Sequence, residues 1–511
     1  MSFMNAMKNE MLENFNESVT ENGAVGYRTT GKALLDINFA VASLRSANEG
    51  EIVRRFQAAF LENKVLAMKW LFFARDIRGG LGERRLFRTA MKYIAKYEPE
   101  VVRKVIGLIP EYGRYDDLWS LLDDNELRPY VVEFVSQQLS EDVANSRNKK
   151  PISLLGKWMP SANASSATTK RYAKILRNAL EMKESEYRRT LSALRKYTDV
   201  VEVKMSAKMW GEIDYEAVPS RANLIYNGAF LRNDEERRRA FLASLEKGEA
   251  RINASTLFPY DIVHQYCSSG YGRNPKSYDA TIEALWKNLP DLVQGCGNTI
   301  VVADGSGSMT SRVGSSGVTA LEVANSLAIY FAEHSSGEFK DKYITFSERP
   351  QFVDFSNANN LRDKILTALR HSEMANTNIE AVFDLILATA VNNNLAQEDI
   401  PANILIISDM EFDTCACSNR SHYGGVDNKL FKVIEQKYKN AGYKLPRLVF
   451  WNVNSRTNTI PVRENNMGVA LVSGFSVNIC KMVMSGKTDP FECLLETLNT
   501  PRYQPVEDAL K

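Results

Sequence analysis

The stretch NTIVVADGSGSM at residues 298–309 decides the fold of the C-terminal part of this chain. The four apolar residues from Ile300 to Ala303 are typical of a strand that is buried on both faces of a sheet. The run ends at Asp304, and hydroxyl side chains follow at Ser306 and Ser308. A strand that ends in an acid and two hydroxyls brings oxygen ligands to one point. The stretch therefore predicts a site for a hard divalent cation, Mg2+ or Mn2+.

Strands alternate with helices in the residues that follow. Short apolar runs predict strands at 299–303, 342–346, 403–408, 447–453 and 468–472. Apolar residues at three- and four-residue steps predict helices at 319–335, 359–370, 378–392, 428–441 and 475–484. This alternation indicates an open, doubly wound, mostly parallel α/β sheet. Such sheets bind ligands outside the carboxyl ends of their strands, where Asp304 is expected.

Two more polar residues are expected near the same edge of the sheet. Asp409 directly follows the expected strand 403–408, and Thr377 lies in a loop before an expected helix. Glu411 and Asp413 follow Asp409. In one alternative they tune a bound ion or repel anionic ligands, and in the other they belong to a solvated loop. We therefore expect an oxygen-rich cluster in which acids and hydroxyls from three segments meet.

The order Asp-x-Ser-x-Ser, then Thr, then Asp resembles the von Willebrand factor A (vWA) domain over about residues 297–500. The resemblance includes all five positions of that family's metal-ion-dependent adhesion site (MIDAS). It implies that the hydroxyls of two serines ligate the metal, and that the threonine and both aspartates bind it directly or through water. The five positions are Asp304, Ser306, Ser308, Thr377 and Asp409. A bound ion of this kind keeps an open position for an external acidic group. In the alternative, the domain is vestigial and its Asp and Ser only cap the following structure.

The preceding residues have helical periodicity instead. From about residue 33 to 290, apolar residues recur at helical steps, and Gly or Pro residues separate the stretches. This pattern predicts an all-α stack of short helices, either an irregular solenoid or a helical ring. The predicted division is a helical domain at 1–297, a vWA domain at 298–500 and a C-terminal tail at 501–511.

An α-helical half followed by a vWA domain resembles the Ro autoantigen family, whose helical part is called the TROVE domain. Residues 74–84, 112–118 and 157–161 are most similar to a poorly characterised group of its relatives in cells and viruses. The Ro resemblance implies a helical-repeat ring that binds structured RNA and single-stranded RNA ends, as part of a ribonucleoprotein. The helical half diverges too far for individual RNA-contacting residues of the family to be transferred.

Basic side chains are concentrated in the helical half. Residues 146–210 contain 15 Lys or Arg and 5 Asp or Glu, and residues 54–96 contain 11 and 3. Such a concentration attracts a polyanion, although solvated helix faces are an open alternative. The predicted RNA-binding residues are Arg75, Arg78, Arg84, Arg85, Lys157, Lys170, Arg171, Lys174 and Arg177.

Aromatic and hydroxyl side chains accompany these cations. Tyr172 lies beside the basic helix face, where it can stack on a base, and Trp158 follows a lysine. The loop 161–169 is rich in small hydroxyl residues that can contact a nucleic-acid backbone. In the alternative, Trp158 is part of the core, and the arginines pair with Asp76, Glu83 and neighbouring acids.

Composition excludes several classes of protein. The 511 residues carry a net charge of +2, and no apolar segment is long enough to span a bilayer. Six scattered cysteines predict a reduced setting, so we expect a cytoplasmic protein with no membrane partner. No nucleophile-elbow or zinc-hydrolase motif occurs, which favours a non-enzymatic function. RNA binding is the leading hypothesis, ahead of a metal-dependent protein-interaction scaffold without RNA and a metal-dependent phosphoesterase.

Overall fold

The computed structural model divides the chain into two compact units. Unit 1 comprises Met1–Asn63 with Leu257–Asn499, and unit 2 comprises Lys64–Thr256 with Thr500–Lys511. The structure describes residues 4, 7, 15–21, 25–267, 275–293, 298–315, 317–347, 349–372, 379–411, 428–461, 469–480 and 489–511. These units depart from the predicted linear boundaries, because helices on both sides of unit 2 in the sequence pack with the sheet of unit 1.

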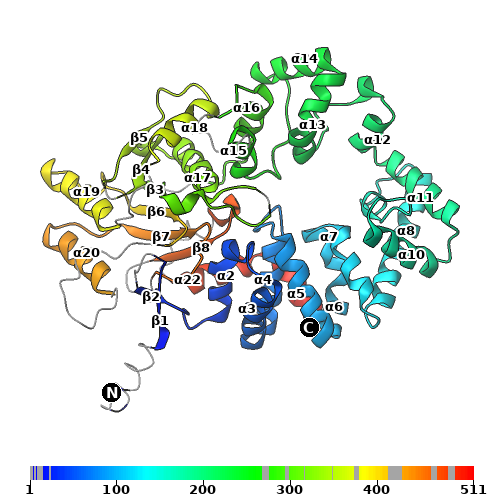
Figure 1. Ribbon diagram of the computed structural model, residues 1–511, viewed down its shortest axis with the longest axis horizontal. Helices are drawn as coiled ribbons and strands as arrows, with labels where there is room; N and C mark the ends of the chain where they lie inside the picture. The colour runs from blue at the N-terminus through cyan, green and yellow to red at the C-terminus, as the bar shows by residue number, and fades with distance from the viewer. Residues whose placement is uncertain are drawn as a thin grey trace. The chain divides into compact units, whose positions relative to one another are not determined.

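Unit 1 is built on a six-stranded sheet (Figure 1). Its strands lie in the order β5-β4-β3-β6-β7-β8, and every neighbouring pair is parallel except β4 and β5. Their bounds are β3 (Thr299–Asp304), β4 (Lys342–Phe346), β5 (Phe352–Asp354), β6 (Asn403–Ser408), β7 (Arg447–Asn452) and β8 (Ala470–Ser473). The predicted doubly wound fold is confirmed. The short edge strand β5 was not predicted, because only one of its three residues is buried.

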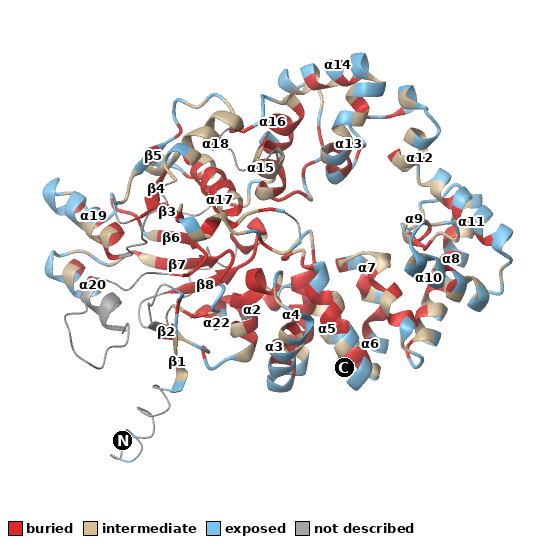
Figure 2. Ribbon diagram, in the orientation of Figure 1, coloured by how far each residue is buried: buried red, intermediate tan, exposed pale blue. Residues whose placement is uncertain are grey.

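Helices cover both faces of this sheet. On one face lies α17 (Ala320–His334), which begins at a capping box formed by Thr319 and Glu322 and packs Phe331 edge-on against Trp451. On the other face, α19 (Ile379–Asn392) and α20 (Asn428–Asn440) share a buried apolar cluster with β3, β6 and β7. Figure 2 shows the strands as the most continuously buried part of the unit. The remaining helices here are α18 (Leu361–Arg370) and α22 (Pro490–Leu498).

Elements that precede the sheet in the sequence complete unit 1. The helix α2 (Ala33–Leu44) is apolar on nearly all sides, and ten of its residues are buried. It contacts β7 and β8, where the Asn452 side chain donates to the carbonyl of Phe39 at 2.9 Å. A hairpin of β1 (Glu17–Val19) and β2 (Val25–Tyr27) pairs with Ile460. The other helices are α3 (Glu49–Glu62), α15 (Pro259–Cys267) and α16 (Ala280–Lys287).

Unit 2 is helical, and its described residues include no strand. Neighbouring helices pack against each other, as α4 (Lys64–Arg75) does with α5 (Arg84–Tyr97) and α13 (Ser220–Asn233) does with α14 (Glu235–Glu246). No described helix of the whole chain is both long enough and apolar enough to cross a membrane. The helices of unit 2 are α4 (Lys64–Arg75), α5 (Arg84–Tyr97), α6 (Pro99–Val105), α7 (Ile109–Tyr112), α8 (Arg128–Arg147), α9 (Leu155–Trp158), α10 (Ala167–Ala179), α11 (Glu184–Tyr197), α12 (Val201–Ser206), α13 (Ser220–Asn233) and α14 (Glu235–Glu246).

The segment predicted as a C-terminal tail is an integral part of unit 2. Its helix α23 (Gln504–Leu510) packs on α4 and α6. Asp76 is fully buried, and it accepts hydrogen bonds from the guanidinium of Arg502 and from the hydroxyl of Tyr503, the latter at 3.1 Å. Lys69, also buried, forms an ion pair with Glu507 at 3.0 Å. The contacts are between residues far apart in the sequence, so no local pattern indicates them.

We expect Arg502→Ala to lower the free energy of unfolding of unit 2 by about 3 kcal/mol, because it leaves the buried Asp76 carboxylate without its charged partner. Urea denaturation followed by tryptophan fluorescence measures the change. Lys511→Ala is the matched control, since it removes an ion pair at the exposed end of α23 and should leave the transition unchanged. Equal stability of Arg502→Ala and the control would contradict this role.

Candidate functional site

The carboxyl ends of β3 and β6 bring predicted metal ligands together. Asp304 is 1 % exposed, and its carboxylate accepts hydrogen bonds from the backbone N–H of Ser306 at 2.8 Å and the hydroxyl of Ser408 at 2.6 Å. The hydroxyl oxygens of Ser306 and Ser308 lie 2.9 Å apart. The predicted Asp-x-Ser-x-Ser cluster is therefore one compact set of oxygens beside a buried strand end.

Asp409 is the second carboxylate of this cluster, and it is also 1 % exposed. Its Oδ2 atom is buried and accepts no hydrogen bond among the described residues, and the guanidinium of Arg456 lies 3.7 Å away. Burial, and then the nearby charge of Asp304, raise the pKa of Asp409 to about 7, against a hydrogen bond from Ser308 that lowers it. Two buried carboxylates, one with an unsatisfied oxygen, fit a cation placed between them.

The fifth predicted ligand, Thr377, lies outside the described residues. The described part of the chain contains no group of three or more His, Cys, Asp or Glu side chains that could hold a metal ion. The predicted set has only two carboxylates, and its other members are hydroxyls.

Glu411 has a structural position that neither sequence alternative described. It is 2 % exposed, and so it belongs to no solvated loop. Its carboxylate accepts hydrogen bonds from the backbone N–H groups of Glu21, Arg456 and Thr457 at 2.7–2.9 Å. Glu411 therefore ties the N-terminal hairpin region and the loop after β7 to the end of β6. Asp413 lies outside the described residues.

The predicted RNA-binding residue Arg75 is a structural residue. It is buried, and its guanidinium forms an ion pair with the buried Asp117 at 2.7 Å. The glycine-rich turn after it is closed as well. A Cβ on Gly79 would lie 2.8 Å from Nε of Arg502, and one on Gly80 would lie 1.9 Å from the carbonyl oxygen of Phe73. These glycines permit close packing within unit 2, so the backbone of the turn contacts protein atoms.

The remaining arginines of this region lie at the surface. Arg78, Arg84 and Arg85 are exposed, and Arg84 lies 4.0 Å from Asp116. Burial lowers the pKa of Arg84, and the positive charges of the nearby Arg114 and Arg88 lower it further. Arg75 pairs with Asp117, and Arg88 pairs with both Asp116 and Asp117, so acids partner these arginines as the sequence alternative described.

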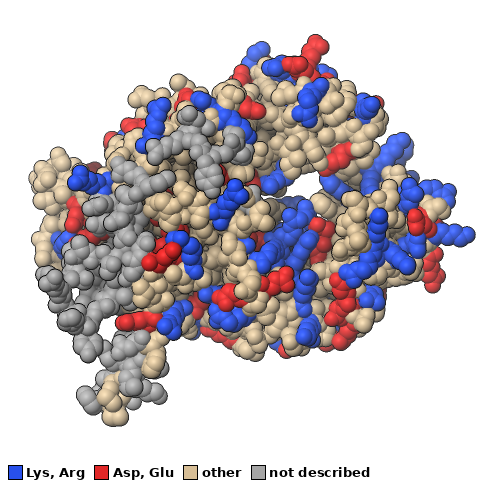
Figure 3. Space-filling model, viewed as in Figure 1, with Lys and Arg blue, Asp and Glu red and all other residues tan. Residues whose placement is uncertain are grey.

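The four predicted cations of α10 divide into two kinds. Arg171 pairs with Asp123 and Arg177 with Glu184, each at 2.8 Å. Lys170 and Lys174 are exposed and have no ion-pair partner in the part of the chain that the structure describes. The positive potential of this helix face thus comes mainly from its lysines. Figure 3 shows many Lys and Arg side chains over the helices of unit 2.

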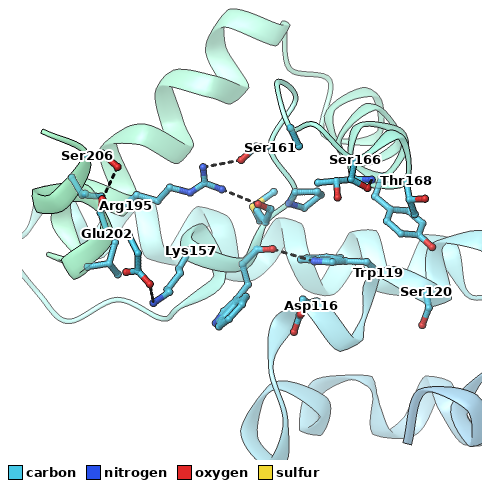
Figure 4. Close-up of a pocket in the computed structure, with 18 of the residues that line it drawn as sticks. Asp116, Trp119, Ser120, Lys157, Ser161, Ser166, Thr168, Arg195, Glu202 and Ser206 are labelled. Atoms are coloured by element: carbon cyan, nitrogen blue, oxygen red, sulfur yellow. Dashed lines mark hydrogen bonds and ion pairs between the residues drawn. The ribbon is translucent and has the colours of Figure 1, made fainter. Parts of the chain in front are cut away.

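A cleft of about 1060 Å³ in unit 2 collects several predicted residues (Figure 4). Trp158 is only half-buried in its wall, and the guanidinium of Arg114 covers the ring at 4.2 Å from the ring centre. The alternative that Trp158 is a core residue is therefore wrong. The predicted aromatic, basic and hydroxyl residues that line the cleft are Lys157, Trp158, Ser161, Ser166, Thr168, Thr169 and Tyr172.

The same cleft contains cations that were not singled out in the sequence. Lys92 and Arg195 line it. Lys92 belongs to the basic stretch 54–96 and Arg195 to the basic stretch 146–210, so the charge of these stretches was the sequence feature that could have indicated them. Lys92 is exposed. Lys157 lies 3.6 Å from Glu202, which also lines the cleft. The cleft therefore combines aromatic rings, hydroxyls and a majority of basic over acidic side chains.

Comparison with known proteins identifies relatives of both halves. Residues 298–500 match the family described as Domain of unknown function (DUF7788), and residues 20–106 and 163–298 match Domain of unknown function (DUF2828). The chain is 28% identical to Uncharacterized protein L728 of Acanthamoeba polyphaga mimivirus over 530 residues, with 96% of this chain and 89% of that protein covered. The predicted resemblance to poorly characterised viral relatives is thus confirmed.

One solved structure extends over most of the chain. It is the crystal structure of Deinococcus radiodurans RO (RSR) protein, which is 14% identical, with a TM-score of 0.39. The match covers 89% of this chain and 93% of that one.

We expect Glu411→Gln to lower the melting temperature strongly and the free energy of unfolding by about 3 kcal/mol, since an amide cannot accept all of the charge-assisted hydrogen bonds. Thermal unfolding in the presence of EDTA measures the effect without a contribution from metal. Glu435→Gln, an exposed position on α20, is the control and should behave as the wild type. A wild-type melting curve for Glu411→Gln would show that the buried carboxylate has no structural role.

Proposed function

We propose that this protein is a non-enzymatic RNA-binding protein whose helical unit holds RNA in the cleft beside Trp158. The observation that carries the proposal is the composition of that cleft, which brings two partly exposed aromatic rings, a hydroxyl-rich loop and four basic side chains together. Arg88, Lys92, Lys157 and Arg195 are the basic residues, and Asp116 and Glu202 are the acidic ones.

The chemistry of the cleft suits a single strand better than a duplex. Rings such as Trp158 and Tyr172 can stack on unpaired bases, which contributes about 1–3 kcal/mol per base in proteins that bind single strands. The hydroxyls of Ser166 and Thr168 can donate hydrogen bonds to phosphate oxygens. The residues that line the cleft are the basis of the proposal.

We further propose that the vWA-like part binds Mg2+ or Mn2+ at the end of β3. Asp304, Ser306, Ser308 and Asp409 would hold the ion, with Thr377 as the fifth ligand. A bound ion supplies an electrophilic point that attracts an external carboxylate or phosphate. Neutral hydroxyls leave the charge of such an ion incompletely balanced, so the site suits recruitment of an acidic group from a protein partner.

Replacement of two lysines tests the RNA proposal. We expect Lys92→Gln/Lys157→Gln to weaken binding of a fluorescein-labelled uridine 16-mer about tenfold at 0.1 M salt, and to reduce the slope of log affinity against log salt by about 1.4. Fluorescence anisotropy measures both quantities. Arg232→Gln/Lys247→Gln removes the same charge from exposed positions of unit 2 outside the cleft and should have little effect. Absence of RNA binding by the wild type at low salt would refute the proposal.

Metal addition tests the second proposal. We expect saturating MgCl2 or MnCl2 to raise the melting temperature of the EDTA-treated wild type, because a ligand that binds only the folded state stabilises it by about 2.7 kcal/mol at one hundred times its dissociation constant. Asp304→Asn and Asp409→Asn should each abolish the shift. Glu338→Gln, an exposed acid in the same unit, should retain it. A shift of equal size in all four proteins would rule out this site.

A further inference from the structure

A second groove in unit 2 adjoins the cleft and shares Ser161 with it. It has a volume of about 640 Å³, and its basic residues are Arg188, Arg189, Arg195 and Lys196. The described residues that line it include no Asp or Glu, in contrast to the cleft. The polar side chains of Asn163 and Ser192 also face this groove. Concave shape, uniform charge sign and hydrogen-bond donors together favour an anionic ligand.

Arg195 separates the groove from the cleft and is held rigidly. Its guanidinium donates to the carbonyl oxygens of Gly156 at 2.9 Å and Met159 at 2.8 Å, and to the hydroxyl of Ser161 at 3.0 Å. All three acceptors are neutral. Burial lowers the pKa of Arg195, Tyr187 opposes this effect, and no carboxylate of the described residues forms an ion pair with the guanidinium. A half-buried positive charge that no acid balances is stabilised when an anion binds beside it.

Arg188 and Lys196 extend the positive charge along the same face of α11. They are spaced eight residues apart, with Ser192 midway, so all three project from one side of the helix. Both cations are exposed, and neither has an ion-pair partner among the described residues. On α10, by contrast, Arg171 and Arg177 are each paired with an acid.

We propose that this groove is a phosphate-binding site, in which Arg188 and Lys196 bind a phosphate group against the fixed guanidinium of Arg195. The guanidinium of Arg188 supplies directional hydrogen-bond donors, and the ammonium of Lys196 supplies a mobile point charge. Both kinds of group bind phosphate oxygens. The groove and the cleft share Ser161, Arg195 and Val203. An RNA strand in the cleft can therefore continue past Arg195 into the groove. RNA as the source of the phosphate rests on the proposed function. Binding of a small phosphorylated ligand in the groove does not depend on that function.

Binding of inorganic tripolyphosphate to the full chain tests the site independently of RNA. We expect isothermal titration calorimetry at 0.1 M salt to show a weakening of at least tenfold for Arg188→Gln/Lys196→Gln. Arg232→Gln/Lys247→Gln, with the same loss of charge elsewhere on unit 2, should stay within twofold of the wild type. Arg195 is left intact in this test, since its replacement also removes three structural hydrogen bonds. Circular dichroism should show that both double variants retain the wild-type fold.

The same variants identify the source of the phosphate. If Arg188→Gln/Lys196→Gln weakens both tripolyphosphate and the uridine 16-mer, the groove binds the RNA backbone. If it weakens tripolyphosphate alone, the groove serves a small phosphorylated ligand. Tripolyphosphate binding by a wild type that fails to bind RNA would support the groove while refuting the proposed function. Absence of tripolyphosphate binding, or an equal loss in both double variants, would overturn the inference.

Discussion

Complete burial of β3 is the constraint on which unit 1 depends. All six of its residues are buried, so apolar elements must cover both faces, and the last residue must satisfy a carboxylate away from water. The first requirement recruits α17 to one face and α19 and α20 to the other. The second is met by hydrogen bonds to Asp304 from the backbone N–H of Ser306 and the hydroxyl of Ser408, while the charge of Asp304 raises the pKa of the nearby Asp409. The candidate metal centre is therefore the polar end of the apolar core.

The two units handle uncompensated charge in opposite ways. In unit 1, two buried carboxylates lie together, and one oxygen of Asp409 accepts no hydrogen bond from any residue that the structure describes. In unit 2, Arg195 is surrounded by neutral acceptors, and a groove without described acids extends from it. Each arrangement is costly unless an ion of opposite sign is bound. The proposed cation in unit 1 and the proposed phosphate in unit 2 rest on the same electrostatic argument.

The fold was predictable where the physical cause is local. An apolar run before Asp304 or Asp409 marks a buried strand and the polar residue that ends it, so both strands and both acids could be read directly. Features that depend on distant partners could not be predicted. Arg75 is basic and lies in a basic stretch, but it pairs with Asp117, and Glu411 accepts hydrogen bonds from residue 21 and from residues 456 and 457. Sequence position alone cannot distinguish a basic side chain that binds a ligand from one that pairs with an acid inside the protein.

The pairing of Asp76 with Arg502 has a consequence for synthesis of the chain. The two residues are 426 positions apart, and all of unit 1 beyond residue 257 is translated between them. At about 5–20 residues per second, Asp76 is synthesised roughly 20–85 s before Arg502. During that interval the helices of unit 2 must tolerate an acid that lacks its counter-charge. Unit 2 therefore reaches its final state only after the α/β sheet has been made, although most of its sequence comes first.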